Sequence, residues 1–157
     1  MTKEENRAYI NNRFIKELNE KGLNNADSFM IAYYDGPIVP KGHPNYNKYK
    51  VNLDIRKNDS LISGEIGLDG IEYNLTEATV DRLYNYVEKH IDKLKKLNDN
   101  QAPDEIAGGD GPLRIKYKLE MIYLKRSLAS VIDKILIDAI RKDIVRIIKE
   151  TSTKKEE

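Results

Sequence analysis

Hydrophobic positions recur at helical intervals near the start of the chain. Thr2 opens a capping-box sequence, T-x-x-E, and apolar residues then follow every three or four positions as far as Leu18. If Gly22 takes a left-handed conformation, Leu18 and Leu23 make the hydrophobic contact of a Schellman ending. The pattern therefore predicts an amphipathic helix over residues 3–21.

Alternating apolar and polar positions follow this helix. The segment SFMIAYY, residues 28–34, favours a strand, and residues 49–56 alternate with a period of two. Two-residue turns at 58–59 and 69–70 continue the pattern into a three-stranded antiparallel meander. The register that places the apolar residues on one face pairs Ile55 with Ile62, Val51 with Ile66, Ile66 with Tyr73, and Leu68 with Ile71.

A second helical pattern begins after the meander. Thr76 is the expected N-cap, and Leu75 and Val80 have the spacing of a hydrophobic staple. The apolar stripe then runs on to Leu94, so we expect one helix packed across the sheet. These elements form a small α+β domain over residues 1–98.

The remaining chain is divided by a glycine-rich stretch. Residues 99–111 have no apolar periodicity and predict a flexible linker. From residue 112 the pattern fits two structures at first, because Leu113 and Tyr117 suit both strand alternation and helical spacing. The helical stripe continues without glycine or proline, so we favour one long helix over residues 112–150. A disordered tail is expected over residues 151–157.

The predicted fold class is thus α+β: an N-terminal helix, an antiparallel β-meander and a packed helix, followed by a long C-terminal α-helix. Such a helix would span roughly 55 Å, more than a compact domain of this size can cover. Packing within the chain is the alternative to packing on another chain. We favour an assembly interface formed by Leu113, Tyr117, Met121, Leu124, Leu128, Val131, Ile135 and Ala139.

The glycines before residue 112 raise the question of a phosphate-binding loop. Neither standard glycine-rich phosphate motif is present, and a carboxylate at Asp110 occupies the place of the anion. Arg114, Lys116 and Lys118 would lie at the positive end of the helix dipole, which disfavours cations. We therefore interpret the glycines as a hinge and these three cations as contacts to an anion or an acidic partner.

A proline-rich loop after residue 34 combines aromatic and basic residues, a combination that suits single-stranded nucleic acid. The candidate binding-loop residues are Tyr34, Lys41, His43, Tyr46 and Lys48.

Composition restricts the function further. The net charge is +1, there is no cysteine, and the two histidines lack partners at ligand spacing, so we expect no metal, cofactor or catalytic residues. No apolar run reaches the roughly 18 residues of a membrane span, and no signal sequence is evident. We expect a cytoplasmic protein without a membrane partner, located in the host cytoplasm or a virion if it is viral.

The sequence favours a non-catalytic assembly protein that forms homo-oligomers or binds a protein partner through its C-terminal helix, as a component of a phage, virus or other mobile element. One alternative is a nucleic-acid-binding accessory protein, although the net charge does not indicate such a partner. Its basic residues would be Lys41, Lys48, Lys50, Arg114, Lys116, Lys118, Lys125 and Arg126. Another alternative is an enzyme with a composite pocket under the proline-rich loop.

Overall fold

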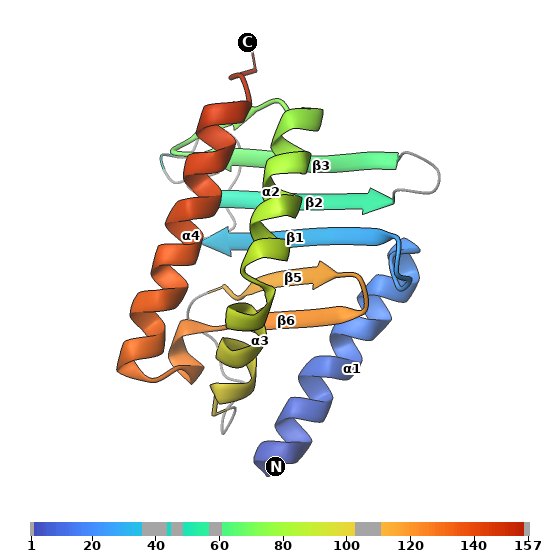
Figure 1. Cartoon of the computed structure of the whole chain (residues 1–157), viewed down its shortest axis with the longest axis vertical. Helices are drawn as coiled ribbons and strands as arrows, with labels where there is room; N and C mark the ends of the chain where they lie inside the picture. Colours follow the sequence, from blue (N-terminus) through green and yellow to red (C-terminus); the bar gives the residue numbers. More distant parts are fainter. Residues whose placement is uncertain (1, 36–43, 45–48, 57–60, 103–110, 156–157) are drawn as a thin grey trace.

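A six-stranded antiparallel sheet forms the centre of the molecule, in the order β4-β3-β2-β1-β5-β6. The computed structural model describes residues 2–35, 44, 49–56, 61–102 and 111–155. Helices α2, α3 and α4 cover one face of the sheet, and α1 lies on the other face (Figure 1). The predicted α+β class is confirmed.

Helix α1, Lys3–Lys21, has the two ends that the sequence predicts. The Thr2 side chain accepts a hydrogen bond from the backbone N–H of Glu5 at 3.1 Å. Gly22 has a φ of 70°, and the N–H of Leu23 donates to the carbonyl of Leu18 at 2.8 Å. These contacts satisfy backbone groups that a helix end leaves unpaired.

The predicted meander is confirmed with its register, but it is only part of the sheet. Its strands are β2, Tyr49–Arg56, β3, Leu61–Leu68, and β4, Ile71–Tyr73, and all four predicted pairs are present. Asp69 and Gly70 have φ values of 54° and 80°, as a type I′ turn requires. The other predicted turn, at 58–59, lies outside the described residues.

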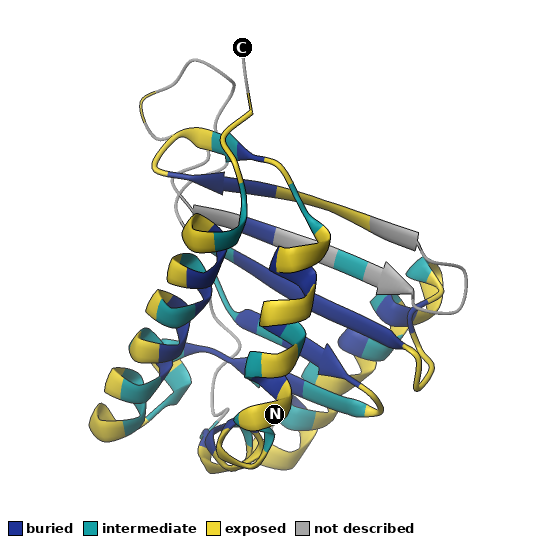
Figure 2. Ribbon diagram, turned by 45° about the horizontal axis from the view of Figure 1, so that its top comes forward, coloured by how far each residue is buried: buried dark blue, intermediate teal, exposed yellow. Residues whose placement is uncertain are grey.

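Strand β1, Ser28–Asp35, is a central strand with apolar residues on both faces, which explains its continuous apolar sequence. Phe29 and Ile31 point to the core under α2, α3 and α4, whereas Met30 and Ala32 pack with residues of α1. Burial by colour shows β1 enclosed between these two layers (Figure 2).

The second helical segment is two helices instead of one. Thr76 is confirmed as the N-cap of α2, Glu77–Lys89, and α3 spans Ile91–Asn100. At His90 the backbone leaves helical geometry, with φ −107° and ψ 14°. The break changes the packing partner, because α2 contacts α4 whereas α3 contacts β6.

The predicted helix over residues 112–150 is wrong in its first part. Residues there form strands β5, Leu113–Tyr117, and β6, Glu120–Leu124, and a short 3₁₀ turn, Arg126–Leu128. Strand β5 pairs with β1, and this pairing selects the strand alternative of the ambiguous pattern. Only α4, Val131–Thr151, is helical.

Part of the predicted linker holds the outer strand of the sheet. The side chain of Asn98 accepts a hydrogen bond from the N–H of Tyr123 at 2.9 Å. Gln101 donates to the carbonyl of Tyr123 at 2.5 Å and accepts from the N–H of Lys125 at 2.7 Å. Residues 98–102 are therefore not a flexible linker, and residues 103–110 lie outside the described part of the chain.

The expected disordered tail is also wrong as far as residue 155. The N–H of Asn74 donates to the carbonyl of Thr153 at 2.8 Å, and the N–H of Lys155 donates to the carbonyl of Glu72 at 2.9 Å. These bonds extend the edge of the sheet beside β4, because the backbone groups of an edge strand need partners.

Candidate functional site

The most exposed apolar surface lies on the first half of α4. Val131, Ile132 and Ile135 are 75%, 72% and 66% exposed, and helical spacing places them on one face. Ala139 is exposed one turn further along the same face. We call these four residues the α4 patch.

The remaining residues of the predicted assembly interface belong to the fold of the chain itself. Leu113, Tyr117 and Leu124 are buried in the core beneath the helices. Met121 packs against the α1 cluster, and Leu128 is half-buried. The sequence pattern places these five residues on an interface only because it predicts a helix where the structure has the β5–β6 hairpin and the short turn after it. Ile132 was not among the assigned residues, although it lies in the same apolar stripe.

The three cations after the glycines lie on a β-hairpin, so the helix-dipole argument for them is wrong. Arg114 forms an ion pair with Glu17 of α1. Burial lowers the pKa of Arg114; the nearby Tyr123 opposes this shift, and the positive charge of Arg13 adds to it. Lys118 is exposed at the hairpin turn with a φ of 50°, and its ammonium lies 5.4 Å from the centre of the Tyr117 ring.

Lys116 has a different environment, since only 1% of it is exposed. Its ammonium donates hydrogen bonds to the Ser28 hydroxyl at 2.5 Å, to the Ser28 carbonyl at 3.1 Å and to the Asn25 carbonyl. Burial lowers its pKa to about 8, against the opposing effect of the nearby Asp27 carboxylate. Lys116 is therefore an internal connection between β5 and the segment that follows α1.

Gly111 is required by close packing, whereas Gly108 and Gly109 lie outside the described residues. A Cβ at this position would overlap the carbonyl oxygen of Tyr34 in β1. The Gly111 carbonyl accepts a hydrogen bond from Arg141 of α4 at 2.9 Å, and the Arg141 guanidinium lies 4.6 Å from the centre of the Tyr33 ring. Gly111 thus joins α4 to β1, where a hinge was expected.

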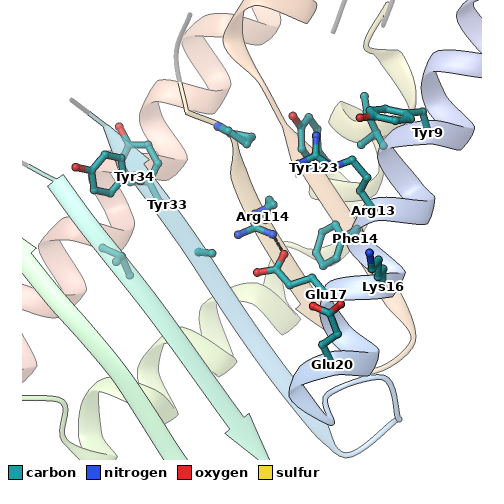
Figure 3. Close-up of a pocket in the computed structure, with 14 residues that line it drawn as sticks. Tyr9, Arg13, Phe14, Lys16, Glu17, Glu20, Tyr33, Tyr34, Arg114 and Tyr123 are labelled. Carbon is teal, nitrogen blue, oxygen red and sulfur yellow. Dashed lines mark hydrogen bonds and ion pairs between the residues drawn. The ribbon is translucent and has the colours of Figure 1, made fainter. Parts of the chain in front are cut away.

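A groove of about 870 Å³ lies between α1 and the sheet (Figure 3). Residues of α1 form one wall, and residues of β1, β5 and β6 form the other. The charged and aromatic residues that line it are Tyr9, Arg13, Phe14, Lys16, Glu17, Glu20, Tyr33, Tyr34, Arg114 and Tyr123.

Only Tyr34 and Arg114 of this groove were assigned from the sequence. The others come from three places: both sides of the amphipathic helix α1, the predicted strand β1, which provides Tyr33, and the β5–β6 hairpin, which provides Tyr123 and which the sequence pattern assigns to a helix. No local motif marks them. Tyr34 of the candidate binding loop lines the groove, whereas Lys41, His43, Tyr46 and Lys48 lie outside the described residues.

Four of the eight cations of the nucleic-acid alternative are buried or paired within the chain. Lys125 is buried, and Arg126 is paired with Asp138 at 2.8 Å. Arg114 and Lys116 face α1 and its connection to β1. Polyanion binding requires cations that reach the phosphates together, and these four residues do not meet that requirement.

Neither a metal centre nor a membrane segment is evident in the described residues. They contain no group of three or more histidine, cysteine, aspartate or glutamate side chains placed to hold an ion. None of the helices in the described part of the chain has the length and apolar character needed to cross a bilayer.

The structure thus defines an α+β protein with an exposed apolar helix face and a separate groove. Comparison of the chain with protein-family models, curated proteins and solved structures finds no significant match.

Proposed function

We propose that this protein is a non-catalytic assembly protein that self-associates through the α4 patch. The observation that carries this proposal is the clustering of exposed apolar side chains. Among the large apolar residues of the described chain, Tyr9, Ile71 and Leu119 are exposed singly, whereas Val131, Ile132 and Ile135 are exposed together. Single exposed apolar residues are common on protein surfaces, but a contiguous group is typical of an interaction site.

A second copy of the chain is the partner that best fits the charges around the α4 patch. Lys134 and Asp138 lie beside it, and Lys142 lies at its C-terminal end. A copy related by a twofold axis presents the same mixture of signs, so no field of like charge opposes the contact. Burying an isoleucine or valine side chain contributes roughly 1.5–3 kcal/mol, which makes three such residues per copy the main source of binding energy.

Light scattering coupled to size-exclusion chromatography tests this proposal on the full chain. We expect a dimer for the native protein and a monomer for Ile135→Asp, because a carboxylate in the centre of a dry interface lacks a partner. Leu119→Asp is the matched control, since Leu119 is 71% exposed and lies on the β5–β6 turn. A native monomer at tens of micromolar, or a dimer that survives in Ile135→Asp, would refute the proposal.

Because β5 and β6 are part of the sheet, the proposed interface is smaller than the sequence predicts. Only the exposed half of α4 is offered to a partner, because Leu113, Tyr117 and Leu124 are occupied within the chain. The association of the protein with a phage or other mobile element stays a prediction from size and composition.

A further inference from the structure

The groove between α1 and the sheet has the size of a small-molecule site. Its volume of about 870 Å³ falls in the range of roughly 300–1,000 Å³ that is typical of ligand pockets. It lies on the face of the sheet that α1 covers, whereas the α4 patch belongs to a helix on the opposite face (Figure 1). The two sites therefore lie on opposite sides of the sheet.

Two cations on the α1 wall of the groove have no acidic partner in the part of the chain that the structure describes. Arg13 and Lys16 lie one helical turn apart and form no ion pair within the described residues. The carboxylate of Glu17, the residue after Lys16, is already shared by Arg114 and by Lys21, the latter at 3.2 Å. An anion entering the groove would therefore meet Arg13 and Lys16 without displacing an existing ion pair.

A second guanidinium lies close to Arg13. The positive charge of Arg13 contributes to the lowered pKa of Arg114, after the larger effect of burial. Both guanidinium groups line the same groove, and a bound anion near them would offset the repulsion between their like charges. Arginine is well suited to this role because its planar donors match phosphate and carboxylate oxygens in pairs.

Aromatic rings surround these cations. The guanidinium carbon of Arg13 lies 5.6 Å from the centre of the Tyr9 ring. The guanidinium carbon of Arg114 lies 5.7 Å from the centre of the Phe14 ring. Tyr123 faces the same part of the groove, and Tyr34 lies at its other end (Figure 3). Tyrosine rings offer flat surfaces for stacking of a planar ligand and cost little conformational entropy to order.

We propose that this groove binds a small anionic ligand with a planar aromatic ring, of the mononucleotide class. The phosphate lies at Arg13 and Lys16, next to the Arg114–Glu17 ion pair, and the base stacks on the tyrosine rings. No covalent step is involved.

A small ligand fits the charge balance better than a nucleic-acid strand does. Arg13, Lys16 and Arg114 carry three positive charges in the groove, and Glu17 and Glu20 carry two negative charges. The chain as a whole has a net charge of only +1. One phosphate is matched by this excess, whereas a polyanion would need a continuous track of cations.

Isothermal titration calorimetry of the full chain tests the proposal with the four ribonucleoside 5′-monophosphates as probes. We expect binding of at least one of them, and binding weaker by about tenfold or more for its nucleoside and for ribose 5-phosphate, because each lacks half of the recognised chemistry. The variant Arg13→Gln should lose about tenfold in affinity through the missing charge-assisted hydrogen bonds. Lys3→Gln, exposed at the other end of the helix, is the matched control and should bind normally.

Three results would overturn the proposal. They are the absence of binding for all four monophosphates at millimolar concentration, equal binding of nucleoside and nucleotide, and much tighter binding of a single-stranded oligonucleotide. Circular dichroism of Arg13→Gln verifies that the variant is folded. Because Arg13 is exposed and forms no ion pair within the described residues, its replacement should leave the fold intact.

Discussion

Replacement of Lys116 by methionine should remove a specific part of the pH dependence of stability. The pKa of Lys116 is lowered by burial to about 8 in the folded protein, and an unfolded lysine has an ordinary value near 10.5. Between these values the unfolded chain binds more protons than the folded chain, so the free energy of unfolding must rise with pH. The free energy of unfolding is highest above the unfolded pKa of Lys116, and this stability is lost as the pH falls through the folded pKa of about 8.

The size of the effect follows from the two pKa values of Lys116. Linkage gives a rise in the free energy of unfolding of about 1 kcal/mol between pH 7 and pH 9. The measured pH range must end at pH 9, because burial and, to a smaller extent, hydrogen bonding raise the pKa of Tyr86 and Tyr117 above the ordinary tyrosine value. Ionisation of these tyrosines in the unfolded chain lowers stability above about pH 10, which would oppose the lysine effect.

Urea denaturation at pH 7, 8 and 9 measures this difference directly. The native protein should become more stable by about 1 kcal/mol over this range, and Lys116→Met should show no such rise. Lys96→Met, an exposed position on α3, is the matched control and should keep the native pH dependence. A native protein whose stability is flat from pH 7 to pH 9, or a Lys116→Met variant with an unchanged rise, would contradict this account of the buried ammonium.

Two further substitutions test contacts that the sequence did not reveal. Gly111→Ala should destabilise the fold by about 1–3 kcal/mol in urea denaturation, because the new Cβ overlaps the Tyr34 carbonyl and the strands must move apart. Native stability in this variant would show that the β1–β5 approach is looser than described. Gln101→Leu should lower the melting temperature by several degrees, since it leaves the Tyr123 carbonyl and the Lys125 N–H without their partner. An unchanged melting temperature would mean that these bonds to β6 contribute nothing to stability.

Local features of the sequence predicted the first part of the fold well. The ends of α1 depend on Thr2 and Gly22. The turn at 69–70 depends on Asp69 and Gly70, because aspartate and glycine adopt a positive φ more readily than most residues. Alternation then determined the register of β2, β3 and β4, because a slip by one residue would turn every apolar side chain to the wrong face. In these elements the interactions lie close together in sequence.

The β5–β6 hairpin could not be assigned in the same way. Leu113 and Tyr117 satisfy both a helical and a strand period, and the partner that decides between the two structures is β1, far away in the sequence. The turn gives no signal either, since Lys118 takes the left-handed conformation that glycine or asparagine usually occupies. Tertiary pairing overrode a pattern that was ambiguous by itself.

The sequence predicted the α4 patch better than it predicted the groove. The α4 patch lies within the apolar stripe that was predicted, since helical spacing alone places Val131 and Ile135 together. The groove was not predicted, because Arg13 looks like an ordinary charge on a solvent-facing side of α1. It becomes part of a site only when the hairpin brings Arg114 and Tyr123 opposite it.

Disulfide cross-linking tests self-association through the α4 patch most directly. The chain has no cysteine, so Ile135→Cys introduces a single thiol, and Ile135 lies in the middle of the patch. Near a twofold axis this residue meets its own copy, and mild oxidation should convert most of the protein to a covalent dimer. Lys96→Cys, on the exposed surface of α3, should stay monomeric under the same conditions. Equal and slow cross-linking of the two variants would contradict an interface at α4.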